Sequence, residues 1–506
     1  MNSDHAGALR RRVLLSGTML AAAAVGYGRR AYGACAPTVA PNYQCSGANV
    51  TTQTIAANNA SASTVAGFSV NSAAGNGITI TGDGALSYTD TNASLLTATA
   101  GTALAITSGG DFAGTPGSIT VNTNGVLSGA NYGILARNYG TGATTVTANG
   151  NVTATAAFSR GIYARNYSGT DLSVTTGAGT TVSGTVGIHV RNDGTGATTI
   201  TVNGNVTGFS GISAYSFTSG TDVTVTTGAG TTVRGVGGEG IDVISRGTGA
   251  TTVTANGDVI STSLGIFAVG AGTGVSVTTA AGTTVSGGTT GIDARNSGTG
   301  VLTITANGDV TGTTGSGIYA KTGTSLSVTT AAGTTVSGGG SNGGIFAGNS
   351  GTGAVTVTAN GNVTGTSARG ISFSNFGTDV TVTTGAGTTV SGATGGIGGC
   401  NLGTGALTIT ANGDVTGTGA GSSGINAVNY GTNLSVTVGA GATVSGSADG
   451  INANNHGSGA LTITANGNVT GTSGSGISVV SGGSPIAITV AATNTVTSAN
   501  ALLSKP

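Results

Sequence analysis

Residues 140–153 read GTGATTVTANGNVT, and this stretch recurs in near-identical form along the chain. The later copies begin at intervals of 51 to 54 residues, at Gly194, Gly247, Gly298, Gly351, Gly403 and Gly457. A segment of the same outline, GTDLSVTTGAGTTVSG from Gly169, lies between the first two copies, so the true period is half as long. A repeat of roughly 20 to 50 residues is typical of solenoids and arrays.

A Gly-Ile pair marks these shorter units from residue 133 onward. Its glycines are Gly133, Gly161, Gly187, Gly211, Gly240, Gly265, Gly291, Gly317, Gly344, Gly370, Gly396, Gly424, Gly450 and Gly476. Their mean spacing is about 26 residues. Because the phase holds along the whole array, each unit is interpreted as one turn of a repeating structure.

Three short strands are predicted in each unit from alternating apolar and polar residues and from the turns between them. In the unit that begins at Gly140 they cover residues 144–148, 151–153 and 162–166. Units stacked about 4.8 Å apart pair their backbone amides with the next coil. The sequence therefore predicts an all-β fold, a parallel β-helix with about 26 residues per coil. β-Hairpins fit less well, because like residues recur a whole coil apart.

Side chains alternate between the two faces of a strand, so Thr144, Val146 and Ala148 are predicted to point inward. In the third strand, Ile162 and Asn166 are predicted inward by the same rule. An inward valine recurs in the second strand of each coil. These valines are Val152, Val182, Val206, Val233, Val259, Val285, Val310, Val336, Val363, Val390, Val415, Val444 and Val469.

The Asn-Gly pairs are interpreted as structural, because amides stacked in register hydrogen-bond along the stacking axis. Their asparagines are Asn149, Asn203, Asn256, Asn307, Asn360, Asn412 and Asn466. The residue after the glycine is Asp at 258, 309 and 414 but Asn in the sibling units. An acid that alternates with Asn is expected to complete a turn and not to act as a catalyst.

Composition excludes several other classes of protein. Charged residues make up 6% of the 506 residues and aromatics 4%, which argues against a conventional charged-surface enzyme. A hydrophobic content of 37% argues against disorder, and the 98 glycines lack the three-residue step of collagen. After residue 34 there are ten basic and fourteen acidic residues, so no nucleic-acid partner is predicted.

The N-terminus predicts export. Arginines at 10–12 precede an apolar run over 13–26 and small residues up to Ala34, the pattern of a signal peptide over 1–34. Cleavage after Ala24 or after Ala34 fits, and the general secretory route is favoured over a twin-arginine route. In an exported chain, Cys35 and Cys45 are expected to form a disulfide. Cys400 is left over, either as an incidental thiol or as a cross-link between chains.

The chain is accordingly divided into a signal peptide (1–34), an N-terminal cap with irregular first coils (35–116), regular repeats (117–495) and a tail (496–506). With its AC…QCSG start and its NGNVTGT and GIxA motifs, the mature chain resembles the passenger region of bacterial autotransporters. That resemblance implies a right-handed β-helix delivered to the cell surface by an outer-membrane translocator. The ending SANALLSKP has no barrel pattern, which suggests a truncated passenger, a separately encoded translocator or another route of display.

The outward positions of the Gly-Ile strand vary more than the inward columns and are the candidate binding face. Its candidate residues are Arg137, Tyr163, Arg165, His189, Arg191, Tyr215, Phe267, Arg295, Tyr319, Lys321 and Phe346. Arg and aromatic residues are enriched at contact surfaces, so a glycan or protein on a host or neighbouring cell is the expected partner. An adhesin or structural rod is therefore expected. The alternative is that charged residues occupy these outward positions only to keep the protein soluble.

Two other functions are weighed. Thr-x-Thr pairs such as Thr145 and Thr147 recur on the first strand, and such a lattice resembles the surface of ice-binding solenoids, although Thr also favours strands. A carbohydrate-active enzyme needs two carboxyls about 5 to 9.5 Å apart. Asp242 and Asp293 share an outward position two coils apart, about 9.6 Å, with Phe267 between them. No general acid lies nearby, so no catalytic residue is predicted. The three histidines, at positions 5, 189 and 456, do not cluster, so no metal is predicted, and no cofactor is expected.

Overall fold

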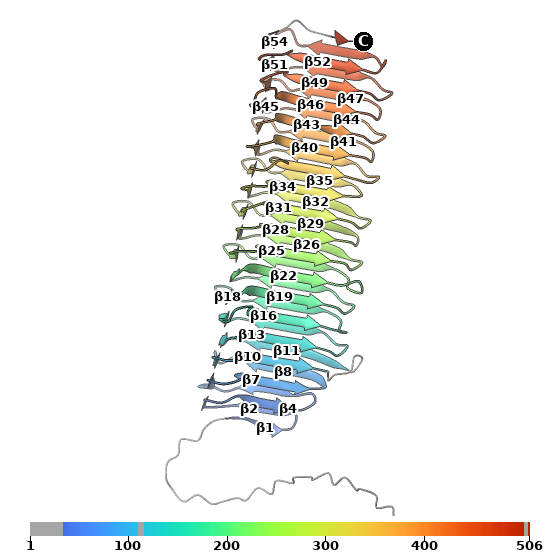
Figure 1. Cartoon of the computed structure of the whole chain (residues 1–506). Helices are drawn as coiled ribbons and strands as arrows, with labels where there is room; N and C mark the ends of the chain where they lie inside the picture. The colour runs from blue at the N-terminus through green and yellow to red at the C-terminus, as the bar shows by residue number, and fades with distance from the viewer. Residues whose placement is uncertain (1–33, 110–115, 500–503, 506) are drawn as a thin grey trace, which may run out of the picture. The chain divides into compact units, whose positions relative to one another are not determined.

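The computed structural model describes residues 34–109, 116–499 and 504–505. The expected signal peptide falls outside these residues, apart from Ala34. The described strands stack as successive coils, each of which gives one strand to each of three sheets (Figure 1). The predicted all-β, parallel β-helical fold with about 26 residues per coil is confirmed.

One coil shows how the sequence pattern becomes structure. It consists of β14 (Thr144–Ala148), β15 (Val152–Ala154) and β16 (Arg160–Asn166). The first strand agrees with the prediction, and the second begins one residue later than predicted. The third begins two residues earlier, because Arg160 pairs with Tyr132 of the preceding coil and with Val186 of the following one.

The first, second and third strands of the coils form sheets A, B and C, respectively. Sheet A begins with β1 (Cys35–Val39), which is followed by β2 (Asn42–Cys45), and it ends with β53 (Ile486–Val490). Sheet B runs from β3 (Ala48–Asn49) to β54 (Val496–Ser498), and sheet C runs from β4 (Gln53–Ala56) to β55 (Ser504–Lys505). The middle strands of sheet C are β13 (Tyr132–Asn138), β16, β19 (Val186–Asn192), β22 (Ser210–Ser216), β25 (Ile241–Ser245), β28 (Ile266–Gly270), β31 (Ile292–Asn296), β34 (Ile318–Thr322) and β37 (Ile345–Asn349).

The core lies inside the coils and is built by repetition. Val146, Val152 and Ile162 are fully buried, and each packs in register on its counterparts in the neighbouring coils. Thr144 and Ala148 also point inward, whereas Thr145 is exposed, as the alternation predicts. Burying one Val or Ile stabilises the fold by roughly 1.5 to 3 kcal/mol, so stacked columns supply the core that a single coil lacks.

The glycine of the Gly-Ile pair is required by close packing between coils. At Gly291, an added Cβ atom would lie 2.6 Å from Cγ1 of Val310 and 2.7 Å from the carbonyl oxygen of Gly317. The other Gly-Ile glycines, from Gly133 to Gly476, each face Cγ1 of a valine of the next coil in the same way. The marker therefore repeats because this corner of the coil has no room for a side chain.

The hydrogen-bonded asparagine ladder lies at the end of sheet C and not at the Asn-Gly pairs. Each buried amide donates from Nδ2 to Oδ1 of the next at 2.9 to 3.0 Å. The ladder consists of Asn349, Asn375, Asn401, Asn429 and Asn455. These side chains also satisfy backbone groups of their own turns, as in the bond from Asn401 Nδ2 to the Gly405 carbonyl.

The expected ladder of Asn-Gly amides is thus corrected. Asn149 Nδ2 does donate to Asn124 Oδ1 of the preceding coil at 3.0 Å. From Asn149 onward, however, the pair occurs in every second coil, and the coil between carries Gly or Ala at the same position, as Gly177 does after Asn149. A continuous row of amides is therefore interrupted. Asn203 and Asn307 instead donate to the backbone oxygens of Thr176 and Thr279 in the preceding coil.

The acids that alternate with Asn complete turns, as expected. Asp258 Oδ1 accepts a hydrogen bond from the backbone N–H of Thr284 at 2.8 Å. Asn205 Oδ1 accepts the equivalent bond from Thr232 at 2.8 Å. Because one oxygen performs this task in either side chain, the carboxylate is exchangeable with the amide.

At the N-terminal end, β1 (Cys35–Val39) pairs antiparallel with β2, and Cys35 and Cys45 form a disulfide. Coils with all three strands already occur before residue 109, within the segment expected to be irregular. At the other end, β54 and β55 continue sheets B and C into the expected tail, because Val496 extends the valine column from Val469. No helix among the described residues is long and apolar enough to cross a membrane.

Candidate binding face

All eleven residues predicted to form a binding face lie on the outward side of sheet C, in two columns. Column 1 holds the residue directly after the isoleucine of the Gly-Ile pair, and column 2 holds the residue two positions further on. The predicted residues in column 1 are Tyr163, His189, Phe267, Tyr319 and Phe346. Those in column 2 are Arg137, Arg165, Arg191, Tyr215, Arg295 and Lys321.

Side-chain contacts divide this face into two groups. The upstream group, called the arginine–tyrosine cluster, spans five coils from β13 to β25 and the turns after their strands. It consists of Tyr132, Arg137, Arg160, Tyr163, Arg165, His189, Arg191, Tyr215, Phe217 and Arg246. The second group, called the downstream cluster, consists of Phe267, Arg295, Tyr319, Lys321 and Phe346.

Four rings run through the arginine–tyrosine cluster, one from each of four consecutive coils. The centroids of Tyr132 and Tyr163 lie 5.7 Å apart, those of Tyr163 and His189 5.3 Å, and those of His189 and Tyr215 5.5 Å. These separations are within the favourable range for tilted aromatic pairs. The coil spacing thus produces a continuous aromatic row across the face.

Arginines of the same coil and of the preceding coil cover part of this row. The guanidinium carbons of Arg160 and Arg137 lie 5.0 and 5.7 Å from the centroid of the Tyr163 ring. As a result, Tyr163 is only 8% exposed, although its strand position points outward. Tyr163 is therefore corrected from an exposed contact residue to the support on which two guanidinium groups rest.

A third column, missed by the sequence reasoning, lies in the turn directly after each sheet C strand. It contains Tyr139, Tyr167, Asp193, Phe217 and Arg246, whose backbone amides bond the preceding coil in register. The signal was available, because each of these residues follows the last inward residue of the strand, as in Asn138-Tyr139 and Asn166-Tyr167. The column was overlooked because turn residues were not assigned a direction.

This third column holds the column 2 arginines in place. Arg165 and Arg191 both form ion pairs with Asp193, at 2.6 and 2.9 Å. Arg165 also lies 3.8 Å above the centroid of the Tyr167 ring, and Arg191 lies 4.3 Å above that of Phe217. A guanidinium fixed by an acid and a ring loses little freedom when it binds a further group.

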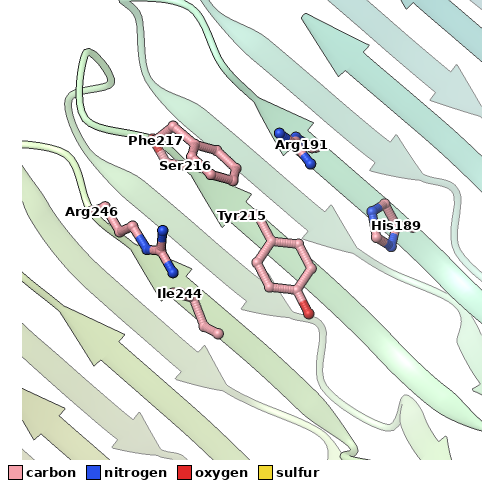
Figure 2. A pocket seen from close by; sticks show the side chains of 7 residues that line it. All are labelled: His189, Arg191, Tyr215, Ser216, Phe217, Ile244 and Arg246. Atoms are coloured by element: carbon pink, nitrogen blue, oxygen red, sulfur yellow. The ribbon is translucent and has the colours of Figure 1, made fainter.

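A hollow of about 360 Å³ opens at the end of the cluster, between the turns after β19 and β25. Its lining residues are His189, Arg191, Tyr215, Ser216, Phe217, Ile244 and Arg246 (Figure 2). Figure 2 shows Arg191 and Arg246 on either side of Phe217, with Tyr215 and Ile244 below them. Apolar rings and two cations thus border one open hollow.

Burial changes the charges near this hollow. It lowers the pKa of His189 to about 4, with help from the positive charges of Arg160, Arg191 and Arg165, so His189 is neutral at pH 7. Burial raises the pKa of Asp242 to about 6, and the nearby Glu239 adds to this effect. The Tyr215 hydroxyl donates to Asp242 Oδ2 at 2.5 Å, which opposes the rise.

The arginine–tyrosine cluster carries excess positive charge. Six of the ten basic residues after position 34 lie between residues 137 and 246, and five of these belong to the cluster. Asp193 is shared by two of them, whereas Arg137, Arg160 and Arg246 form no ion pair within the described part of the chain. The buried Nε atoms of Arg137 and Arg160 also have no hydrogen-bond acceptor there.

The downstream cluster is smaller and better neutralised. Arg295 forms two hydrogen bonds with Asp293, both at 2.8 Å, and lies 5.2 Å from the centroid of Tyr319. Tyr319 and Phe346 stack with their centroids 5.0 Å apart. Lys321 lines a hollow of about 190 Å³ beside these rings.

The two acids weighed as a catalytic pair have separate partners. Asp242 and Asp293 share column 1 two coils apart, as expected, but both are buried beneath other side chains. Asp242 accepts from Tyr215 and Asp293 from Arg295. Cys400 is a half-buried free thiol in column 2. Among the described residues, no three His, Cys, Asp or Glu side chains are grouped closely enough to hold a metal ion.

Searches of protein-family models, curated proteins and solved structures found no match to this chain.

Proposed function

We propose that the chain is an exported β-helical rod, displayed on a cell surface or secreted, that acts as an adhesin or structural passenger. Its binding face is the outward side of sheet C, centred on the arginine–tyrosine cluster, and its partner is a glycan or protein on a host or neighbouring cell. It acts by binding and not by catalysis. The resemblance to autotransporter passengers supports surface delivery through an outer-membrane translocator.

One observation carries the proposal: five arginines and a row of four mutually tilted rings lie within five consecutive coils of one sheet. Binding energy at protein surfaces is concentrated in Arg, Tyr and Trp side chains that pack closely together. On sheets A and B the outward positions are filled mainly by Thr and Ser, which are sufficient for strand formation. The fold therefore does not require the cluster.

Binding of the purified rod to cells and to a glycan array tests this face. The variant Tyr163→Ala, Arg165→Ala, Arg191→Ala is expected to lose binding, because it removes a support ring and two fixed guanidinium groups. The control variant, Thr252→Ala with Thr254→Ala, changes outward residues of sheet A. Unchanged binding by the first variant, with coils intact by circular dichroism, would remove sheet C as the binding face.

Export is tested separately, by expressing the full chain with a C-terminal tag and fractionating the cells. The tagged product is expected at the cell surface or in the medium, shortened by 24 or 34 residues if cleavage follows Ala24 or Ala34. A full-length product confined to the cytosol would contradict the export proposal. Recovery at the surface only with a co-expressed translocator would support the autotransporter-like route.

Ice binding is a second candidate, favoured by the regularity of sheet A. One of its outward columns is Thr in fourteen consecutive coils without a register shift. It consists of Thr147, Thr175, Thr201, Thr226, Thr254, Thr278, Thr305, Thr329, Thr358, Thr383, Thr410, Thr437, Thr464 and Thr489. The adjacent outward column alternates mainly Thr and Ser, as in Thr145 and Ser173.

Such a face presents hydroxyl and methyl groups about 4.8 Å apart along the axis and about 6.6 to 7 Å across it. A repeating lattice of this kind is the property expected of a surface that holds ordered water. Thermal hysteresis of the purified rod tests it, with Thr278→Lys and Thr305→Lys as a disrupted lattice. Absence of hysteresis in the unmodified rod would end this candidate and leave the sheet C proposal untouched.

A further inference from the structure

We infer that the ligand of the arginine–tyrosine cluster is a linear acidic glycan, one whose sugars carry carboxylate or sulfate groups, bound along the coil axis. This inference rests on the proposed function and specifies the chemistry of the ligand at that site. Three observations support it: the uncompensated charge, the way the arginines are held, and the hollow between Arg191 and Arg246.

The charge on this face selects an anion. Of the five guanidinium groups, only those of Arg165 and Arg191 form an ion pair in the described residues, and both share one acid, Asp193. Arg137 and Arg160 each keep a buried Nε donor without an acceptor in the described residues. A buried donor that lacks an acceptor costs roughly 1 to 3 kcal/mol, so an oxygen anion that reaches it binds favourably. Bidentate contacts to carboxylate or sulfate oxygens suit the guanidinium fork.

The arrangement of these arginines selects an extended ligand. They come from four of the five coils between β13 and the turn after β25, since Arg160 and Arg165 share the β16 coil and the β22 coil contributes none. Four steps of about 4.8 Å separate the first from the last, so the charges extend over about 19 Å. A single anionic sugar reaches only some of them. A chain of acidic sugars parallel to the axis reaches them in succession.

The hollow selects a sugar within that chain. Arg191 and Arg246 lie 4.3 and 5.7 Å from the same Phe217 ring, on opposite sides of the opening in Figure 2. Tyr215 and Ile244 form an apolar surface between them. A sugar ring placed there contacts Tyr215 with its apolar face and directs an acidic substituent toward either guanidinium. In a nucleic acid each phosphate bridges two sugars, so the sugar carries no terminal acidic group of this kind.

The test is calorimetry on the full rod with four hexamers: a sulfated glycosaminoglycan, an oligogalacturonate, the neutral maltohexaose, and single-stranded DNA. We expect both acidic glycans to bind, with affinity that falls as salt rises, and the neutral glycan and DNA to bind at least tenfold more weakly. Comparison of the first two ligands distinguishes sulfate from carboxylate recognition.

The variant Arg191→Ala with Arg246→Ala is expected to weaken the binding of acidic glycan at least tenfold. Arg234→Ala is the matched control for lost charge, because Arg234 is exposed on β24 (Thr232–Gly235) of sheet B. Three results would overturn the inference. The first is that DNA binds as tightly as the acidic glycans, and the second is that Arg234→Ala weakens binding as much as Arg191→Ala with Arg246→Ala does. The third is that neither acidic glycan binds. If cells or neutral glycans then still bind through sheet C, the proposed function survives; if they do not, both fall.

Discussion

The substitution Gly291→Ala tests the packing that makes the coils stack in register. Ordinary van der Waals contact to a Cβ atom begins near 3.4 Å, whereas a Cβ at this position would lie 2.7 Å from the Gly317 carbonyl oxygen of the next coil. Relief of this contact by separation of the two coils needs about 0.7 Å. The same oxygen accepts a 2.9 Å hydrogen bond from the Ile292 amide, so that movement stretches the bond beyond hydrogen-bonding distance.

The magnitude follows from these two effects. Overpacking against Val310 costs roughly 1 to 3 kcal/mol. Loss of the donor at a buried carbonyl costs a similar amount, roughly 1 to 3 kcal/mol. Gly291→Ala is therefore expected to destabilise its coil by about 3 kcal/mol. Gly323→Ala is the control, because nothing lies within 4 Å of its added Cβ and its φ is not left-handed.

Hydrogen exchange followed by mass spectrometry measures this effect coil by coil, which suits a solenoid that does not unfold as one unit. In Gly291→Ala, a peptide covering residues 291–317 is expected to exchange about 100-fold faster, since each 1.4 kcal/mol is a factor of ten. Peptides several coils away should change little. Exchange within threefold of the unmodified rod, or an equal effect of Gly323→Ala, would refute the account of the Gly-Ile pair.

Three further measurements test other parts of the structure. Asn401→Ala should destabilise by about 2 kcal/mol, because two buried ladder amides lose a partner, whereas the exposed Asn149→Ala should be nearly neutral in urea unfolding. Burial raises the pKa of Asp242 from 3.8 to about 6, so the native state binds this proton more tightly than the unfolded state, and about 2 kcal/mol of stability is lost between pH 4 and 7. Asp242→Asn should remove that loss in unfolding curves compared across this range. Cys45→Ser should increase proteolysis at β1 and β2 while later coils keep their protection, because the disulfide joins only those strands.

The repeated part of the fold was predictable from the sequence because each coil repeats the same physical constraint. A residue such as Val146 is inward in one coil, so its in-register counterparts are inward in all. The same argument located the turn acids, since Asp258 and Asn205 use one oxygen for one backbone amide. The sequence shows each position once per coil, so the residues at that position can be compared between many coils. A pattern that arises by chance in one coil does not recur in the others.

Contacts between neighbouring coils were not predictable in the same way. Strand periodicity places Tyr163 outward, but the long side chains of Arg137 and Arg160 reach across from their own positions and cover it. The sequence predicts the amide ladder at the Asn-Gly pairs, but Gly or Ala occupies that position in the intervening coils, and the continuous ladder runs through Asn401. Both misses concern side-chain reach and coil-to-coil register, which become definite only when the coils are stacked.

The solubility alternative for the charged face predicts that charges of both signs are spread along the coils. The acids meet this expectation, because many of them lie at corners and accept a backbone amide of the next coil, as Asp171 and Asp379 do from Ala197 and Ala406.

The arginines behave differently. Five of them gather on one sheet within five coils, next to stacked rings and apart from most of the acids. Clustering of like charges raises the electrostatic energy of the free rod and so lowers its stability. The same charges spread evenly over the surface would make the rod equally soluble. The fold can use Thr or Ser at these positions, as it does over sheet A. A partner that neutralises the cluster gives a physical reason for this placement, whereas solubility alone gives none.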